Sequence, residues 1–236
     1  MPRKARILVP NCPHHLVQRG HNRKALFVSD EDKQYYLSNL KEWKENLDIK
    51  LLAWCLMTNH IHLIVEPPEN ASTLSELMKR INGRQTAYVN RLEGRSGSLW
   101  EGRFKASPIQ SEHYLLRCYR YVELNPVQAG MVSLPEEYAW SSYQARLNGL
   151  NTSMLDDQPQ KMLDDHPVYL MLGLDNEARL KQYKEFVRQG ITANEAQFIR
   201  DSIKRNQLTG SDRFVDEIEQ RVGIRVERRS PGRPRL

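Results

Sequence analysis

Two strand-like runs joined by a two-residue turn constrain the fold of this chain more than any other feature of its sequence. The first run, LLAWCLM, covers residues 51–57, and after Thr58 and Asn59 the second run, HIHLIV, covers residues 60–65. A run that is apolar throughout is typical of a strand buried on both faces. The short turn favours an antiparallel hairpin. The sequence therefore predicts a sheet in the interior of the domain.

Strands and helices alternate on both sides of this hairpin. Further strands are expected at residues 14–19 and 103–110. Helices are expected to begin at Ser29 or Asp30, at Thr73 (with Glu76 at capping-box spacing) and at Ser111, the last ending near Asn125 because Pro126 follows. This order resembles the split βαβ, ferredoxin-like layout. We expect an α+β fold in which helices cover one face of a mostly antiparallel sheet.

The chain changes character after residue 147, where the main domain is expected to end. Residues 148–175 begin with a polar stretch rich in turn-forming residues and are predicted to be a linker. Residues 176–223 hold three short amphipathic patterns, near 176–189, 193–206 and 211–222, which predict a small helical C-terminal annex. Residues 224–236 are expected to form an irregular basic tail.

Composition excludes several classes of protein. Of the 236 residues, 39% are hydrophobic and 27% are charged, which excludes a collagen-like or wholly disordered chain. No apolar stretch approaches the ~18–20 residues of a membrane span, and none follows the basic N-terminus as in a secretory signal. The three cysteines are widely spaced and form no CxxC motif. We therefore expect a cytoplasmic protein with no membrane partner and no disulfide framework.

The second strand of the hairpin carries a His-x-His pair. Side chains at positions i and i+2 of a strand share one face, so the imidazoles of His60 and His62 can meet one ion. Neutral imidazole nitrogens suit divalent transition metals and can share Mg²⁺ with oxygen ligands. Two exposed polar side chains on a strand are the alternative interpretation.

The helix expected after residue 111 places Tyr121 on the flank of its apolar stripe. That stripe consists of Leu115, Cys118, Tyr119 and Val122. Asn125 lies one turn after Tyr121, on nearly the same face. A phenol in this position either serves a site or packs at the helix edge with its hydroxyl in water.

Positive charge is spread over the second helix and the strand after it. The chain holds 35 Lys and Arg against 29 Asp and Glu, a net charge of +6, which points mildly to nucleic acid. Arginines on rigid elements with aromatic residues among them are typical of a single-strand groove, where cations follow phosphates and rings stack on bases. A solvated helix face is the alternative. The candidate DNA-binding residues here are Arg80, Arg84, Arg91, Trp100, Arg103 and Lys105.

The basic tail contains the sequence PGRPR at residues 231–235. A Gly-Arg-Pro core flanked by arginines resembles an AT-hook, an extended segment that enters a narrow minor groove. A generic basic tail is the alternative interpretation. The candidate DNA-binding residues here are Arg228, Arg229, Arg233 and Arg235.

Three separated motifs resemble those of the REP-associated tyrosine transposases, which belong to the HUH single-tyrosine transposases of bacterial insertion sequences. The motifs are NHIHLIV at 59–65, LWEGRFK at 99–105 and RYVELNPVQAGMV at 120–132, accompanied by PHHLVQRG at 13–20 and WSSY at 140–143. Their order and spacing also agree with this family. The resemblance covers roughly residues 1–146.

The resemblance implies a catalytic domain over residues 1–147 and a defined chemistry. His60 and His62 would hold a divalent metal, Mg²⁺ or Mn²⁺, Asn125 would complete the metal site, and Tyr121 would be the nucleophile. The implied enzyme is a metal-dependent DNA endonuclease and strand transferase of transposition or recombination, with a 5′-phosphotyrosine intermediate. Its implied partner is single-stranded or hairpin DNA, such as REP-like palindromes, bound by a monomer or a homodimer.

Two other functions stay open at this point. A catalytically silent relative would bind hairpin DNA and act as a regulator. A metal-dependent hydrolase would use a bound water, release a 5′-phosphate and survive the loss of Tyr121. A covalent protein–DNA adduct distinguishes the transferase from both.

Overall fold

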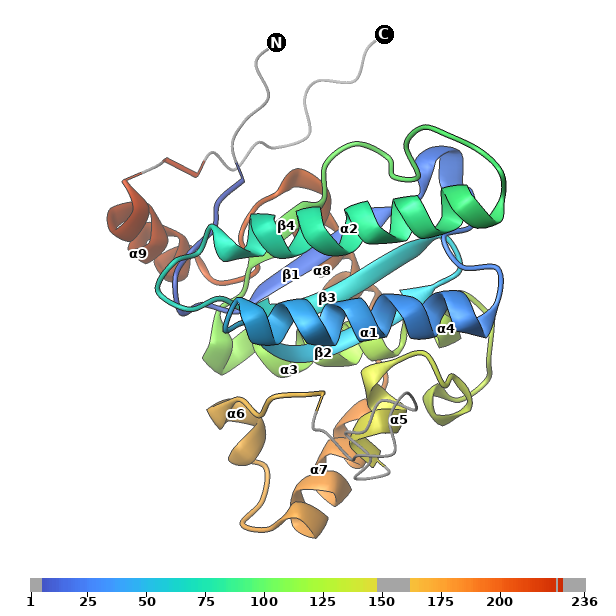
Figure 1. Ribbon diagram of the computed structural model, residues 1–236. Coiled ribbons are helices and arrows are strands. Elements are labelled where there is room, and N and C mark those ends of the chain that lie inside the picture. Colours follow the sequence, from blue (N-terminus) through green and yellow to red (C-terminus); the bar gives the residue numbers. More distant parts are fainter. Residues whose placement is uncertain (1–5, 148–161, 224, 227–236) are drawn as a thin grey trace, which may run out of the picture.

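The predicted interior sheet is present and has four strands (Figure 1). The computed structural model describes residues 6–147, 162–223 and 225–226. Its strands are β1 (His14–Arg19), β2 (Lys50–Met57), β3 (His60–Glu66) and β4 (Lys105–Pro108), in the spatial order β2-β3-β1-β4. All three strand pairs are antiparallel, which is the arrangement of a split βαβ, ferredoxin-like sheet. The predicted fold class is confirmed.

The hairpin of β2 and β3 sets which side chains face which layer. The two strands pair from Met57 and His60 at the turn to Leu51 and Val65 at the far end. Because successive side chains of a strand point to opposite faces, Ile61 and Val65 face one layer while His60 and His62 face the other. β2 is buried along nearly its whole length, as its apolar composition requires.

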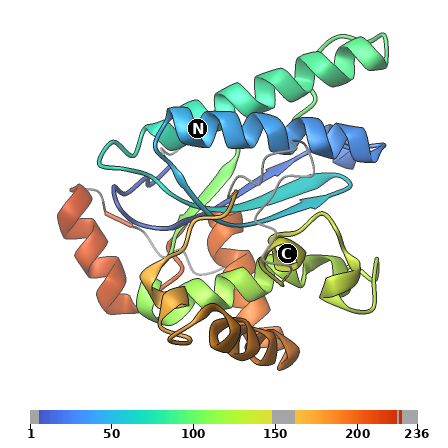
Figure 2. The same ribbon diagram turned by 60° about the horizontal axis from the view of Figure 1, so that its bottom comes forward.

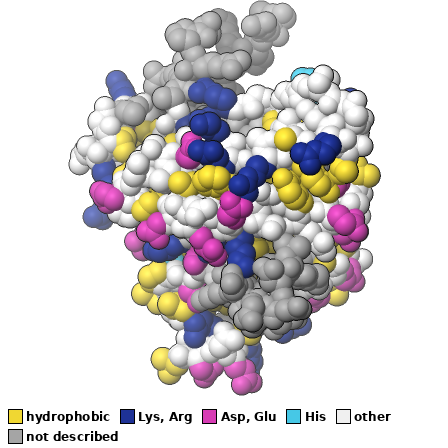
Figure 3. Space-filling view, viewed as in Figure 1, with side chains coloured by type: hydrophobic (Ala, Val, Ile, Leu, Met, Phe, Trp, Pro, Cys, Tyr) yellow, Lys and Arg dark blue, Asp and Glu magenta, His cyan; other side chains and the backbone are white. Residues whose placement is uncertain are grey.

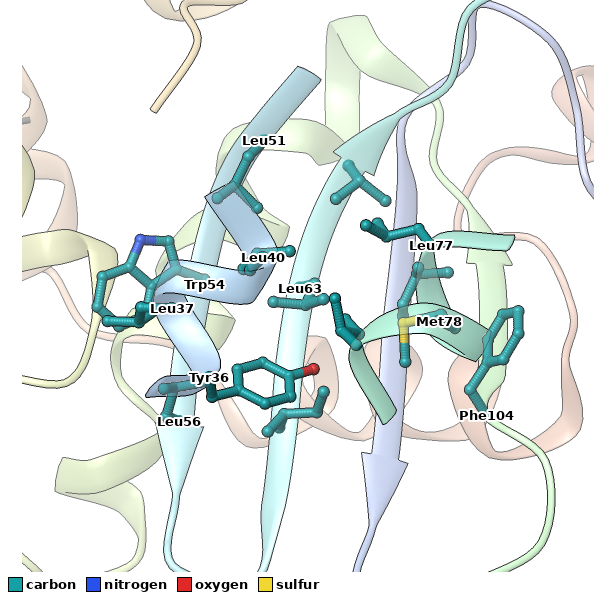
Figure 4. Packing of buried hydrophobic residues seen from close by; sticks show 14 of the residues in the cluster. Tyr36, Leu37, Leu40, Leu51, Trp54, Leu56, Leu63, Leu77, Met78 and Phe104 are labelled. Atoms are coloured by element: carbon teal, nitrogen blue, oxygen red, sulfur yellow. The ribbon is translucent and has the colours of Figure 1, made fainter. Parts of the chain in front are cut away.

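Helices α1 (Asp30–Asn46) and α2 (Thr73–Leu92) cover the first face of the sheet. In Figure 4, Tyr36 and Leu40 of α1 and Leu77 of α2 lie over Leu63 of β3. All four side chains are fully buried, and each stabilises the fold by about 1.5–3 kcal/mol relative to exposure. Tyr36 and Leu40, one turn apart on α1, therefore attach this helix to the sheet.

A second helical layer covers the opposite face, which corrects the expectation that helices lie on one face alone. It contains α3 (Ser111–Glu123), α7 (Asn176–Arg188) and α8 (Ala193–Arg205), and Figure 2 shows the sheet between the two layers. Leu115 and Tyr119 of α3 pack with Ile64 of β3 and Ile199 of α8 in one buried cluster, the second-face cluster. The apolar residues of β2 on both faces are the sequence feature that requires this second layer.

The described part of the predicted linker is packed, not extended. Met162 and Leu163 are buried in the hydrophobic cluster that α1 and α2 form with the first face of the sheet. The Asp164 carboxylate accepts hydrogen bonds from the Leu51 backbone N–H at 2.8 Å and from the Lys44 ammonium at 2.6 Å. The short helix α6 (Pro167–Leu170) then joins the second-face cluster. Residues 162–170 are therefore part of the main core.

The three helices predicted for the C-terminal annex form close to their expected positions, but they do not form a separate unit. α7 and α8 share the second-face cluster, and α9 (Asp212–Val222) packs on the N-terminal segment through Val9 and Ile218. Gly223 ends α9 in the left-handed conformation, as its position predicts. The basic tail with Arg228, Arg229, Arg233 and Arg235 lies outside the described residues.

The sequence expectation holds at the start of α1 and fails in one detail at the start of α2. At α1 the Asp32 carboxylate accepts from the Ser29 backbone N–H, so the helix begins where predicted. At α2 the predicted capping box does not form, because the Thr73 hydroxyl donates to the Asn70 carbonyl and Glu76 pairs with Arg80.

The remaining elements are η1 (His21–Arg23), α4 (Asn125–Gln128), η2 (Pro135–Glu137) and α5 (Ser142–Leu147). In the described part of the chain, no helix combines the length and apolar character that crossing a bilayer requires.

A buried polar network fixes the C-terminal end of α3. The Glu123 carboxylate accepts hydrogen bonds from Ser142 at 2.6 Å and Tyr183 at 2.5 Å, and Arg146 lies 3.6 Å away. Glu123 is fully buried, so these contacts replace the water it loses. Removing one partner of a buried pair of this kind costs about 3–5 kcal/mol. The network therefore holds the helix turn that carries Tyr121.

Candidate active site

The His-x-His pair lies side by side on the second face of the sheet, as the strand period predicts. The ring centroids of His60 and His62 are 5.0 Å apart. His62 is only 4% exposed and His60 is half-buried at the end of β3 beside the hairpin turn. Both rings line a cavity of about 1080 Å³.

Each ring has a neighbour at its Nδ1 atom. His60 Nδ1 lies 2.8 Å from Asn59 Oδ1, and since an amide oxygen only accepts, His60 donates and its Nε2 keeps a lone pair. His62 Nδ1 lies 2.8 Å from Nε2 of His15, a fully buried residue of β1. When His62 donates in that hydrogen bond, its Nε2 also keeps a lone pair. Both histidines can therefore present Nε2 to a ligand.

Burial keeps these histidines neutral. Burial and, to a smaller extent, the nearby Arg19 together lower the pKa of His60 to about 4. Burial also lowers the pKa of His62 well below its ordinary value and that of His15 to about 3. A neutral imidazole is the form that binds a metal ion.

Tyr121 projects from α3 toward the same histidines. Its ring centroid lies 6.0 Å from that of His62 and 5.9 Å from that of His15, both edge-on, and its side chain is 4% exposed. Burial raises the pKa of its phenol, while the nearby Arg200 of α8 acts in the opposite direction. The Tyr121 side chain, predicted on the flank of the apolar stripe, thus faces the cavity and not open solvent.

Asn125 follows the end of α3 and begins α4. Its Nδ2 donates to the Tyr121 carbonyl at 2.7 Å, and its side chain lines the cavity together with Gln128. His60, His62, Tyr121 and Asn125 are therefore brought to one cavity, from a strand, a helix and the turn after it.

The donor set of this cavity fits a metal ion that shares its coordination with a substrate. Within the described ranges, no three His, Cys, Asp or Glu side chains are grouped to hold a metal. Two imidazoles and an amide oxygen of Asn125 or Gln128 would leave several positions of an octahedral ion for water or phosphate oxygens. That set fits Mn²⁺ or Mg²⁺ better than a closed structural zinc site, which takes four protein ligands.

Basic side chains surround the cavity. Arg103 and Lys105, both predicted DNA contacts, line it. Glu101 is the acidic residue among the described lining side chains. Four further cations that no sequence pattern indicated also line it, namely Arg6, Arg19, Arg200 and Lys204.

The other predicted DNA contacts lie elsewhere. Arg80 pairs with Glu76 at 2.6 Å and Arg84 with Glu42, and both guanidinium groups stack on Trp43 of α1, so they serve the first helical layer. Trp100 is buried and its indole N–H donates to the Asn82 carbonyl, so the structure does not support base stacking by Trp100. Arg91 is exposed in the last turn of α2.

Comparison with known proteins agrees with this geometry. Residues 8–125, half of the chain, match the family described as IS200-like transposases. A Haemophilus influenzae protein named as a REP-associated tyrosine transposase is 23% identical over 134 residues, which covers 50% of this chain and 76% of the relative. A solved structure described as a REP-associated tyrosine transposase bound to a REP hairpin has the same fold, with a TM-score of 0.56 at 17% identity over 71% of this chain and 93% of that one.

The family match spans all four strands and Tyr121, and ends at Asn125. Helices α7, α8 and α9 lie beyond it. The resemblance inferred from the three sequence motifs is confirmed, and the chain belongs to the family of IS200-like transposases.

Proposed function

We propose that this transposase-family protein is a single-tyrosine DNA nuclease and strand transferase whose nucleophile is Tyr121. The observation that carries the proposal is the placement of the Tyr121 ring, 6.0 Å from the His62 ring, in the wall of one basic cavity. A phenol, a pair of neutral imidazoles and several cations are the groups that attack on a DNA phosphate requires.

The reaction is a transfer between two oxygen atoms. The Tyr121 oxygen forms a bond to the phosphorus of a DNA phosphodiester while the bond from phosphorus to the 3′ oxygen breaks. The phenol proton passes to water, and the departing 3′ oxygen takes a proton from water. The products are a 5′-phosphotyrosine and a 3′-OH, and attack by a second 3′-OH reverses the step and joins the strands.

The histidine pair supplies the metal site of this proposal. His60 and His62 would hold Mg²⁺ or Mn²⁺ through Nε2, with the amide oxygen of Asn125 as a third ligand. When bound, the ion would polarise the phosphate and neutralise charge that develops on its oxygens.

His15 is a positioning residue for this site. Its Nε2 lies 2.8 Å from His62 Nδ1, and when His15 accepts this hydrogen bond, His62 has the tautomer whose Nε2 binds metal. The register of β1 and β3 places His15 opposite Ile64, one diagonal step from His62, so the contact follows directly from the sheet. His15 acts through His62 and touches no substrate.

The substrate we propose is single-stranded or hairpin DNA. Cations on the cavity rim favour a phosphate backbone of either strand type. The solved relative named above is bound to a REP hairpin, which supports a folded single strand as the ligand. A hairpin brings a recognised duplex and a cleavable single strand to one protein surface.

Covalent capture of DNA tests this function. A hairpin oligonucleotide with a single-stranded flank, labelled at its 3′ end, is incubated with Mg²⁺ and analysed on a denaturing protein gel. We expect a labelled protein band with the natural chain and with Tyr114→Phe, and none with Tyr121→Phe. Tyr114 is the matched control because it lies on the same helix beside Phe198 and not at the histidine pair. A 5′-phosphate product without a protein band would favour the hydrolase, and binding without cleavage the silent regulator.

A further inference from the structure

Helix α8 belongs to the C-terminal region but packs against α3, the helix that carries Tyr121. Its first turn is fixed to α3 because the Glu195 carboxylate accepts two hydrogen bonds from Arg120, at 3.0 and 2.8 Å. Its middle is fixed by Ile199, which is fully buried in the second-face cluster. Both bonds come from Nη2 of the largely buried Arg120, while its Nη1 donates to the Phe186 carbonyl at 3.1 Å, so the guanidinium has a defined position.

The end of α8 is fixed to the strand that borders the cavity. Asn206 ends the helix in the left-handed conformation, and its Oδ1 accepts from the Ala106 backbone N–H of β4 at 3.1 Å. Thr209 extends this contact, because its hydroxyl lies 2.8 Å from that of Ser107 and its backbone N–H donates to the Pro108 carbonyl. Three separate anchors therefore position α8, so the side chains on its inner flank have fixed places.

Arg200 and Lys204 stand on that inner flank, one turn apart. Both line the cavity that holds His60, His62 and Tyr121. Arg200 also lies close enough to the Tyr121 phenol to lower its pKa, and the phenol oxygen is the atom that performs the attack in the proposed function. Arg200 Nη1 donates to Gln197 Oε1 at 3.3 Å on the same helix, which restrains the guanidinium.

Its position beside the Tyr121 phenol separates Arg200 from the other cations of the cavity. A cation on the rim strengthens DNA binding equally before and during the reaction, so it does not raise the rate at saturating DNA. A guanidinium beside the attacking oxygen lies close to the phosphate during the attack. Its planar fork offers donors for the tyrosine oxygen and for a phosphate oxygen at once.

We propose that Arg200 is a catalytic residue of this enzyme, supplied by a helix outside the part of the chain that the family match covers. It holds the Tyr121 oxygen in line with the phosphate and neutralises charge on the phosphate oxygens as the new bond forms. Arg200 keeps its own protons, and the phenol proton passes to water as described above. The inference rests on the proposed tyrosine chemistry and adds the C-terminal region to the active site.

The test compares single-turnover adduct formation by the full-length chain at saturating hairpin DNA. We expect Arg200→Ala to lower the rate constant about 100-fold, the scale of one lost transition-state donor. DNA affinity should fall less than tenfold. Arg200→Lys should recover part of the rate, because it keeps the charge but not the fork. Thermal unfolding of each variant shows that the fold is intact.

The matched control is Arg205→Ala on the same helix. Arg205 is exposed, pairs with Asp201 at 3.6 Å and does not line the cavity, so its loss should leave the rate constant unchanged. A wild-type rate constant in Arg200→Ala, with or without weaker binding, would show that Arg200 contacts the DNA backbone only and would overturn the inference. An absence of adduct in the natural chain would overturn the proposed function as well.

Discussion

Basic residues gather in two regions of this molecule, on opposite faces of the sheet, and the two differ in what the charges contact. On the first face Arg80 and Arg84 of α2 are paired with Glu76 and Glu42 and stack on Trp43. Figure 3 looks onto this face and shows Lys and Arg side chains beside Asp and Glu. On the second face six cations line one cavity with a single acid among the described residues.

The difference teaches how a basic surface becomes a binding site. An arginine that is already paired with a carboxylate contributes little net charge to a polyanion, and its side chain is committed to the helix contact. Among the described residues, Arg19, Lys105 and Lys204 have no acidic partner, so their charge acts on whatever enters the cavity. The spacing of arginines along a helix does not show whether they are paired with carboxylates or whether they face a cavity. The following predictions test this comparison.

Loss of a metal ligand should have the largest effect. We expect His60→Ala or His62→Ala to reduce adduct formation at least 1,000-fold, because the site loses one of its two imidazoles. Excess EDTA should reduce the natural chain to the same level. Measured rates above one tenth of the natural value, in either variant or in EDTA, would contradict the assignment of the metal site to this face.

The neighbouring histidines His14 and His15 sharpen the comparison, since they point to opposite faces of β1. His15→Ala should weaken Mn²⁺ binding about 10–100-fold in calorimetry, because it orients His62. His14 Nδ1 lies 2.7 Å from the Cys12 carbonyl and its Nε2 accepts from Val9 N–H, so His14→Ala should destabilise the fold and leave Mn²⁺ affinity unchanged. Equal loss of Mn²⁺ affinity in the two variants would sink the positioning role.

Acid should destabilise the protein through these buried histidines. Burial lowers the pKa of His14 to about 4, whereas the unfolded chain has the ordinary value near 6.5. Below pH 6.5 the unfolded state binds more protons, so stability present above that pH is lost as pH falls toward 4. Urea unfolding in EDTA should show that His14 accounts for about 2 kcal/mol of the loss between pH 7 and 5. An equal loss in His14→Gln would refute this source.

Removing cations from the two regions should give the smallest but most direct contrast. The double variant Arg19→Ala with Lys105→Ala should weaken single-strand binding about tenfold and lower the salt slope by about 1.4 units, at ~0.7 per contact. The double variant Arg80→Ala with Arg84→Ala should leave both quantities unchanged. The reverse result would return the DNA-binding surface to the first face.

Much of this organisation could be predicted from local sequence. The hairpin, the three C-terminal helices and the shared face of His60 and His62 follow from hydrophobic period and turn chemistry, which act over a few residues. The direction of Tyr121 was predicted only as the flank of a stripe, because helical period does not show which neighbour covers that flank.

Long-range contacts could not be predicted in the same way. His15 reaches His62 only through the pairing of β1 with β3, and Arg200 reaches Tyr121 only because Arg120 and Ala106 dock α8. A four-residue spacing of Arg200 and Lys204 marks one flank of an amphipathic helix, but not the surface it meets. The two-layer coverage of the sheet could not be predicted because helical period does not show that α3 packs on the face opposite to α1 and α2, or that the C-terminal helices join it there.

Identification of the residue that carries DNA in the trapped adduct tests the central claim most directly. The covalent complex formed with the natural chain is digested with nuclease and protease, and the modified peptide is sequenced by mass spectrometry. The proposed chemistry predicts a 5′-linked nucleotide on the Tyr121 oxygen, in a peptide of α3. A nucleotide on Tyr114, on another residue, or on none would contradict the account of this cavity as the catalytic site.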